Sequence, residues 1–192
     1  MKKTLENLAK AFISESQARN RYTMFAKTAK KEGFEQIAAV FEETADQERE
    51  HAKWLFRMIC DLNGKEKTGE IKVESRVPFV CGSTIDNLAE AINGENYEHT
   101  QMYPQFAETA EEEGLTDVAA RLRSIAIAET HHEERYKKLK DVFEESSVFK
   151  KKEEKVWICR KCGYMKKGNE APSICSSCGH PQGYFQTQNE TY

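Results

Sequence analysis

Hydrophobic side chains recur at helical spacing through most of the chain up to Glu145. This period of about 3.6 residues predicts amphipathic helices over residues 4–32, 34–63, 84–113 and 115–145. Glycine follows each of the first three helices, at Gly33, Gly64 and Gly114, where a left-handed residue commonly ends a helix. The joins at Gly33 and Gly114 are short, so the helices are expected to form two antiparallel hairpins.

The segment between the two hairpins, residues 64–83, has no sustained helical period. A mainly α protein with a four-helix bundle and one long crossover has the ferritin-like topology, which is the fold we expect. After a charged run, the composition changes to short fragments that carry Gly, Pro and Cys. We therefore expect a bundle in residues 1–148, a linker in 149–155 and a small metal domain in 156–192.

The two hairpins repeat each other. Residues 25–29 read FAKTA and residues 106–110 read FAETA, an offset of 81 residues. The same offset carries Tyr22 onto Tyr103, Glu48 onto Glu129 and His51 onto His132. This pattern indicates an internal duplication.

Carboxylates interrupt the apolar stripe of every predicted helix. Glu48 and His51 form a Glu-x-x-His pair on one helix face, and the repeat forms a second pair. The inward positions of the first and third helices hold the others, namely Glu15, Glu95 and Glu98. Burying them uncompensated would cost several kcal/mol per ion. A Glu from each of two helices plus two Glu-x-x-His pairs is typical of di-iron or di-manganese sites, and oxygen-rich ligation suits these metals better than zinc.

One extra residue breaks the repeat in the third helix. The offset of 81 would carry Glu15 onto Asn96, yet the glutamates are Glu95 and Glu98, and Pro104 follows closely. We therefore predict a π-bulge within residues 94–104. Glu98 has no counterpart in the first helix, which makes it the candidate for a ligand that moves.

Two tyrosines, Tyr22 and Tyr103, lie about two turns from these carboxylates. They are either core aromatics with satisfied hydroxyls, or donors to a ligand carboxylate or a bound oxygen species.

The C-terminal segment contains two Cys-x-x-Cys pairs, formed by Cys159, Cys162, Cys175 and Cys178. This spacing predicts a tetrahedral metal site, and zinc ribbons and rubredoxin-type iron sites share it. So short a segment cannot build its own core, so the metal must stabilise its fold. A redox dimetal site on the same chain favours iron, because iron can relay single electrons. Cys60 and Cys81 are interpreted as a buried thiol and a loop thiol.

The overall charge is nearly balanced, with 29 Lys and Arg against 32 Asp and Glu and a formal charge of −3. This argues against nucleic-acid binding. No apolar run approaches the ~20 residues that span a bilayer. The N-terminus is interpreted as the start of a helix rather than a signal peptide. Metal-type cysteine pairs suit a reducing compartment, so we expect a cytoplasmic protein.

Four motifs, ESQARNRY from Glu15, EREH from Glu48, ENYE from Glu95 and ETHHEER from Glu129, resemble rubrerythrin, and the cysteine module completes the resemblance. The resemblance implies a non-haem di-iron peroxidase that reduces hydrogen peroxide to water in oxidative-stress defence. It also implies a homodimer that receives electrons from rubredoxin or an NAD(P)H-dependent reductase, with NADH as the ultimate source. The four cysteines would then hold one iron.

The same resemblance implies a role for each bundle ligand. Glu48 and Glu129 would bridge the irons; Glu15 and Glu98 would bind one iron, with His51 replacing Glu98 on reduction; Glu95 and His132 would bind the other. Ser176 stands where the second rubredoxin-like knuckle usually has proline. The alternatives are a di-iron oxidase acting on oxygen, a ferroxidase acting on Fe(II), and a zinc-ribbon binding module.

Overall fold

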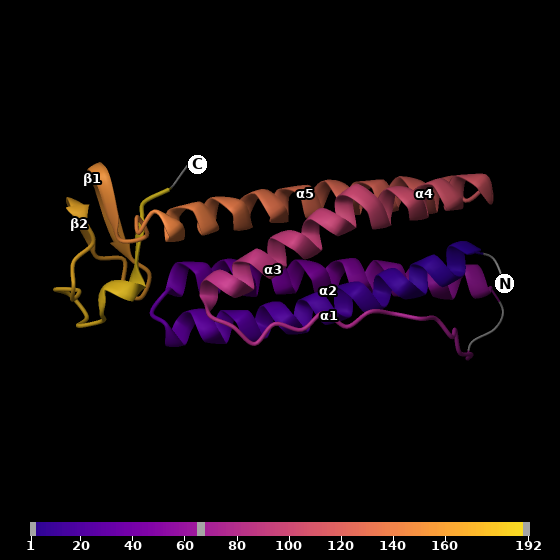
Figure 1. Ribbon diagram of the computed structural model, residues 1–192, viewed down its shortest axis with the longest axis horizontal. Helices are drawn as coiled ribbons and strands as arrows, with labels where there is room; N and C mark the ends of the chain where they lie inside the picture. The colour runs from indigo at the N-terminus through magenta and orange to yellow at the C-terminus, as the bar shows by residue number, and fades with distance from the viewer. Residues whose placement is uncertain (1–2, 65–67, 190–192) are drawn as a thin grey trace.

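The computed structural model describes residues 3–64 and 68–189. Long helices dominate the chain, and a small three-stranded module lies at one end of the bundle (Figure 1). The helices are α1 (Lys3–Lys31), α2 (Glu35–Asn63), α3 (Thr84–Tyr97), η1 (Glu98–Met102), α4 (Tyr103–Glu112) and α5 (Thr116–Glu144). Because α3, η1 and α4 run on as one rod, the architecture is the expected ferritin-like four-helix bundle.

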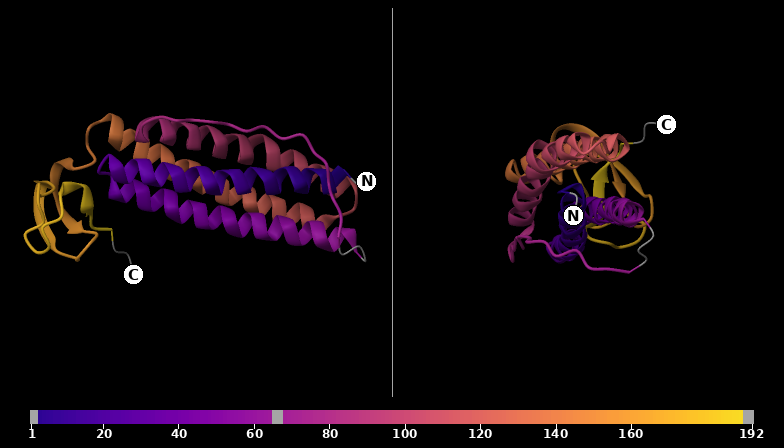
Figure 2. Two further views of the ribbon diagram at one scale, coloured as in Figure 1. Left: turned by 90° about the horizontal axis from the view of Figure 1, so that it is seen from below. Right: turned by 90° about the vertical axis from the view of Figure 1, so that its right-hand side faces the viewer.

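The two predicted hairpins are confirmed. α1 packs along α2, and the α3–α4 rod packs along α5. Positive φ angles of 84° at Gly33, 61° at Gly64 and 75° at Gly114 show the expected left-handed residues. The crossover after α2 returns along the outside of the bundle to the start of α3 (Figure 2). There, Ser83 and Asp86 form a reciprocal capping box that begins α3.

The predicted π-bulge is also confirmed, because residues Glu98–Met102 form the π-helix η1. It absorbs the extra residue that the repeat analysis places between Glu95 and Tyr103. Pro104 follows it at the start of α4, where its missing N–H costs little. The π turn therefore lets Glu95, Glu98 and Tyr103 all lie on the buried face of one rod.

The buried core is divided into two hydrophobic clusters. One gathers apolar residues from the α4 end of the bundle, including Leu8, Leu55 and Leu122. The other gathers residues from the opposite end, including Phe41 and Tyr136. Every long helix passes from one cluster to the other, and a buried glutamate lies between the two segments: Glu15, Glu48, Glu95 and Glu129. The polar layer is thus sealed by apolar side chains on both sides.

The C-terminal module is a sheet of order β2-β1-β3, built from β1 (Lys150–Cys159), β2 (Met165–Glu170) and β3 (Phe185–Thr187), with a short 3-10 turn η2 (Gln182–Tyr184). Residues 150–155 of the expected linker form the start of β1, and the division into domains stays a prediction. The charged run pairs at its start with Glu170, and the register of the β1–β2 pairing shifts between Lys150 and Lys155.

The module packs on the turn between α1 and α2. The ring of Phe149 stacks on Phe34, with centroids 5.9 Å apart. A Cβ on Gly183 would lie 2.3 Å from the carbonyl oxygen of Gly33, so only glycine allows this backbone approach.

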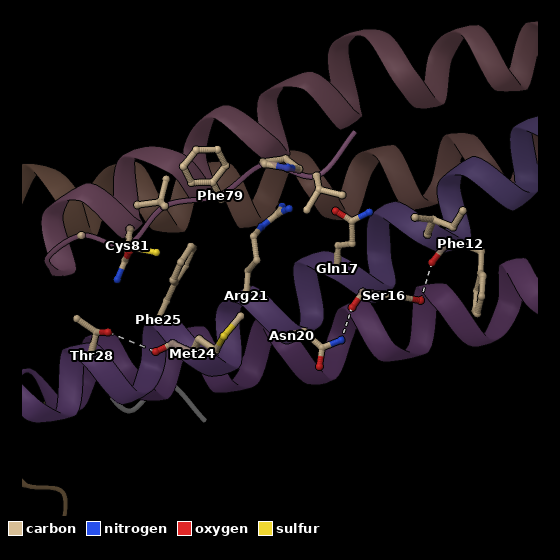
Figure 3. A pocket seen from close by; sticks show the side chains of 16 residues that line it. Phe12, Ser16, Gln17, Asn20, Arg21, Met24, Phe25, Thr28, Phe79 and Cys81 are labelled. Atoms are coloured by element: carbon tan, nitrogen blue, oxygen red, sulfur yellow. Dashed lines mark hydrogen bonds between the residues drawn. The ribbon is translucent and has the colours of Figure 1, made fainter. Parts of the chain in front are cut away.

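An apolar groove of about 810 Å³ lies between α1 and the crossover (Figure 3). Phe12, Met24 and Phe79 line it, and Phe79 is 87% exposed. Within the described ranges, no helix is both long and apolar enough to cross a membrane.

Candidate metal centre

Two groups of side chains could each hold a metal ion in the middle of the bundle. In the described part of the chain, the first group is Glu15, Glu48, His51 and Glu129, and the second is Glu48, Glu95, Glu129 and His132. Within each group the potential ligand atoms lie within 4.8 Å of one another. Glu48 and Glu129 belong to both groups, so two metal ions here would share these carboxylates.

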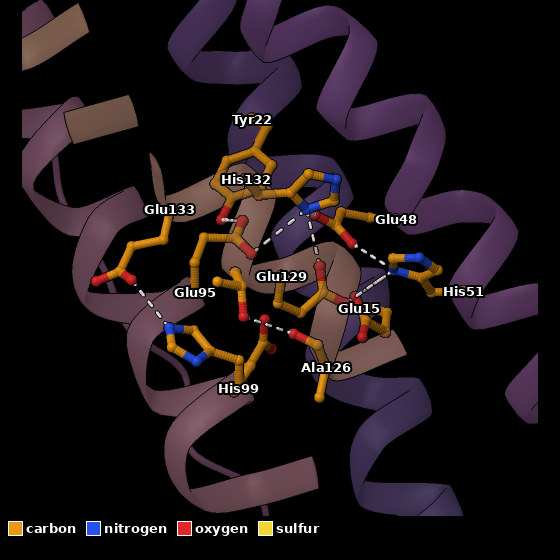
Figure 4. Close-up of polar contacts among 12 residues, drawn as sticks. Glu15, Tyr22, Glu48, His51, Glu95, His99, Ala126, Glu129, His132 and Glu133 are labelled. Atoms are coloured by element: carbon orange, nitrogen blue, oxygen red, sulfur yellow. Dashed lines mark hydrogen bonds and ion pairs between the residues drawn. The ribbon is translucent and has the colours of Figure 1, made fainter. Parts of the chain in front are cut away.

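The imidazoles lie among the carboxylates (Figure 4). His132 Nδ1 lies 2.8 Å from Glu129 Oε2, 3.1 Å from Glu48 Oε1 and 3.5 Å from Glu95 Oε2. His51 Nδ1 lies 2.9 Å from Glu129 Oε1 and 3.0 Å from Glu48 Oε2. One imidazole therefore faces each side of the shared carboxylate pair.

The donor atoms fit metal ions better than they fit one another. Oxygens of Glu15, Glu48, Glu95 and Glu129 and the Nδ1 of His132 are buried without a hydrogen bond of regular geometry among the described residues, and the two imidazoles are their close cationic partners. These four carboxylates are fully buried. Two imidazoles cannot neutralise four buried carboxylates, and buried charge that is not neutralised is costly, whereas convergent oxygen atoms with two imidazoles suit iron or manganese. The donor set thus fits a pair of iron ions.

The pKa shifts of these side chains also show that the cluster is stabilised by positive charge. Burial and then neighbouring carboxylates raise the pKa of Glu15 and Glu95 well above the usual glutamate value. Burial also opposes ionisation of Glu48, but His132 and His51 outweigh it and lower its pKa to about 2. Burial would lower imidazole pKa values, yet carboxylates raise the pKa of His51 to about 10 and that of His132 to about 12. The cluster holds positive charge either as protons or as metal ions.

The two tyrosines meet the ligands of the opposite hairpin. The hydroxyl of Tyr22 on α1 donates to Glu95 on α3, and that of Tyr103 on α4 donates to Glu15 on α1. Both rings are buried. Both hydroxyls are thus satisfied by carboxylates that are predicted to be ligands, and a catalytic role for either tyrosine stays a prediction. These exchanged bonds orient the terminal carboxylates and tie the hairpins together.

Glu98 is the one sequence-predicted bundle ligand outside both groups. It is 4% exposed, and its Oε1 accepts a hydrogen bond of 2.6 Å from Ser14 Oγ on α1. Burial and then the charges of Glu129 and Glu48 raise the pKa of Glu98 to about 8. Glu98 belongs to neither group, so its role as a metal ligand stays a prediction.

The hydroxyl of Ser14 should stabilise this position of Glu98. We expect Ser14→Ala to lower the free energy of unfolding of the metal-free protein by about 1–2 kcal/mol, because a buried oxygen loses its donor. Urea denaturation measures the change. Ser16→Ala is the matched control, because Ser16 lies on the same helix and, among the described residues, its hydroxyl bonds to the carbonyl of Phe12 alone. Equal effects of the two substitutions would refute a specific role for Ser14.

The four cysteines of the module also converge. Cys159 Sγ lies 3.8 Å from Cys178 Sγ, and Cys162 Sγ lies 3.6 Å from Cys175 Sγ. Four thiolates about 2.3 Å from a tetrahedral metal are about 3.8 Å apart, so these distances fit a metal site. They are too long for disulfides, and all six cysteines are free. Cys60 is exposed, which corrects its interpretation as a buried thiol; Cys81 is an exposed loop thiol.

These features define a class: a ferritin-like di-iron carboxylate protein with a rubredoxin-type iron site. The rubrerythrin family model matches residues 6–140, and the model for the rubrerythrin rubredoxin-like domain matches residues 157–186. The chain belongs to the rubrerythrin family.

Individual relatives agree over nearly the whole length. Rubrerythrin-1 of Clostridium acetobutylicum is 50% identical over 99% of this chain and 96% of its own. The rubrerythrin of Porphyromonas gingivalis is 49% identical over 99% and 92%. A structure of fully reduced, all-ferrous nigerythrin aligns with a TM-score of 0.64 at 32% identity, covering 96% of this chain and 86% of that chain.

Sequence reasoning missed several polar residues next to the ligands. Ser14 supports Glu98, while Asn96, His99 and Glu133 form a separate network on the α3–α5 side. These residues are polar and lie on helices rich in charged residues, so the hydrophobic periodicity did not distinguish them from surface residues. The one available hint was position, because each of these four directly precedes or follows a predicted ligand in the chain.

Proposed function

We propose that the protein is a peroxidase that reduces hydrogen peroxide to water, H₂O₂ + 2e⁻ + 2H⁺ → 2H₂O. The observation that carries this proposal is a sealed pair of carboxylate–imidazole groups sharing Glu48 and Glu129, on one chain with a four-cysteine site. A small oxidant that takes two electrons matches two adjacent iron ions. An electron-relay site on the same chain matches an enzyme that must be reduced again after each turnover.

A pair of irons held by the two carboxylate groups would supply two-electron reduction, and an iron held by the four cysteines would supply electrons one at a time. The protein provides the arrangement. Glu48 and Glu129 hold both metal positions, while Tyr22 and Tyr103 orient Glu95 and Glu15 through hydrogen bonds. The apolar clusters on either side exclude water. We propose that Glu98 and His51 would exchange as ligands of the metal ion held by the first group. Glu98 is buried and is hydrogen-bonded to Ser14.

Removing Glu98 tests this exchange. We expect Glu98→Ala to slow peroxide turnover by about tenfold to a hundredfold, because a nearby ligand that tunes the metal is lost. Both irons should stay bound, because each group keeps its four other ligands. Turnover is measured with a saturating donor, and iron by elemental analysis. Unchanged turnover would remove Glu98 from the mechanism.

The function itself is tested anaerobically. The fully reduced protein is mixed with hydrogen peroxide or with dissolved oxygen, and the thiolate-to-iron absorption is followed by stopped flow. Faster return of colour with peroxide supports the peroxidase and its electron relay. Faster return with oxygen would make the protein an oxidase, and rapid multiple turnover of Fe(II) with oxygen would make it a ferroxidase. A colourless four-cysteine site would mean zinc and would remove the relay.

We further propose that the protein works as a cytoplasmic homodimer reduced by rubredoxin or by an NADH-dependent reductase. Basic residues outnumber acidic ones in residues 150–192, whereas acidic residues outnumber basic ones in 1–149, so the module of one copy complements the bundle of another. The apolar groove beside Phe79 is a second surface that another copy could cover. In this proposal residues 1–148 are the catalytic unit and 156–192 the electron-relay unit. Sedimentation equilibrium tests the dimer.

A further inference from the structure

Glu133 is a buried carboxylate that the metal site does not use. It is 5% exposed and belongs to neither bundle ligand group of the described residues. It follows His132 directly on α5, but its side chain lies toward α3 and η1, to the side of the cluster (Figure 4). A buried carboxylate needs compensating partners, and its partners identify what it holds.

Three groups contact this carboxylate. Asn96 Nδ2 donates to Glu133 Oε1 at 2.9 Å, and His99 Nε2 lies 2.9 Å from Oε2. Lys137 Nζ, one turn along α5, lies 2.7 Å from Oε1. Asn96 is the next-to-last residue of α3 and His99 is the second residue of η1, so the contacts to Glu133 span the start of the π turn.

Each of the three central residues directly follows a proposed ligand in the chain. Asn96 follows Glu95, His99 follows Glu98 and Glu133 follows His132. Consecutive helical residues are about 100° apart around the axis. The contacts of Glu133 with Asn96 and His99 therefore fix how the α3–η1 segment and α5 are rotated about their axes. That rotation sets the direction in which the neighbouring ligand side chains point.

The first hairpin offers an internal comparison. The offset that carries Glu48 onto Glu129 carries Ala52 onto Glu133, and the offset that carries Glu15 onto Glu95 carries Ser16 and Arg19 onto Asn96 and His99. There Ala52 is buried and apolar, Ser16 bonds within its own helix, and α1 is continuous α-helix. The network thus occurs in the hairpin that contains the π turn.

A π turn is a rare arrangement that tertiary contacts must support. If the turn relaxed to α-helix, the following residues would rotate by about 100° relative to those before it. Glu95 and Tyr103, which lie on either side of the turn, would then no longer both face the cluster. We propose that Glu133 is a positioning residue that, through Asn96 and His99, holds the π turn in register and so keeps Glu95 directed at the metal pair.

Hydrogen exchange of the full-length, metal-free protein tests this directly. We expect Glu133→Ala to raise amide exchange in residues 95–103 by about tenfold or more, with exchange in α1 unchanged. In the iron-loaded protein, chelator should then remove one iron of the pair at least about tenfold faster than in the parent, because Glu95 belongs to the second group alone. Mössbauer spectroscopy distinguishes the remaining single iron from an intact pair and from the four-cysteine iron.

Two further variants separate positioning from simple packing. Glu133→Gln keeps the shape of the side chain and an acceptor oxygen. Amide exchange in residues 95–103 of this variant should therefore stay within about threefold of the parent. Glu134→Ala removes the next carboxylate, which is exposed, and should change nothing. Raised exchange throughout the bundle, or faster loss of both irons equally, would overturn the proposal, because either result indicates a general loss of packing. Unchanged exchange in residues 95–103 would also overturn it.

Discussion

Replacing Glu129 by alanine should leave the bundle folded but unable to hold a pair of iron ions. Glu129 belongs to both ligand groups and contacts both imidazoles. Its loss therefore removes a ligand from each metal position, whereas loss of Glu15 or Glu95 affects one. We expect peroxide turnover to fall by about a thousandfold or more, equivalent to about 4 kcal/mol of transition-state stabilisation.

The effect of this substitution on stability should depend on metal. Without metal, Glu129→Ala removes one of several mutually repelling carboxylates but also the contacts of Glu129 with His51 and His132, so these effects oppose each other and the melting temperature should change little. With metal, the parent gains about 4 kcal/mol when the free metal is a thousandfold above the dissociation constant, and the variant should lose most of this gain. Thermal denaturation with and without Fe(II) under anaerobic conditions measures both effects.

Glu50→Ala is the matched control for Glu129→Ala. Glu50 is an exposed glutamate on α2, close in sequence to Glu48, and it pairs with the surface residue Lys53. Its removal should change neither metal binding nor turnover. A Glu129→Ala protein that still binds two irons would contradict the shared role of this carboxylate, and one that unfolds without metal would contradict the repulsion argument.

Replacing Cys175 by serine should unfold the C-terminal module and leave the bundle intact. The buried residues of the module are Trp157, Cys159, Ala171, Cys175 and Phe185, so two of the five are metal ligands. So small a core cannot stabilise the segment without the metal, whose binding supplies about 10–16 kcal/mol in comparable structural zinc sites. We expect the thiolate-to-iron colour to disappear and residues 150–189 to become protease-sensitive.

The enzymatic consequence of Cys175→Ser should be selective. Steady-state peroxide reduction with a protein donor should fall to background, while a single turnover of the pre-reduced di-iron site should persist. Cys60→Ser and Cys81→Ser are matched controls, since both thiols are exposed and lie outside the four-cysteine cluster. Retained colour in Cys175→Ser, or loss of colour in either control, would contradict this assignment.

Much of the fold could be predicted because its determinants are local. The apolar period identified every long helix, and glycines at helix ends identified both hairpins. The π turn was predictable because an extra residue in a repeat must be accommodated within the helix. The start of β1 was not, because Lys150–Lys155 is too polar to resemble a strand and pairs only through contacts with β2.

The metal-site residues divide in the same way. The sequence alone determined which predicted ligand carboxylates and imidazoles lie inward, because burial on one helix face follows from spacing along the chain, but it missed the buried Glu133 and wrongly placed Cys60 in the core. Only the tertiary structure decided that Tyr22 meets Glu95, that Ser14 holds Glu98 apart and that Glu133 binds Asn96. These contacts join residues 73, 84 and 37 positions apart in the chain. They depend on how far each helix is rotated against its neighbours, and periodicity within a single helix carries no information about that rotation.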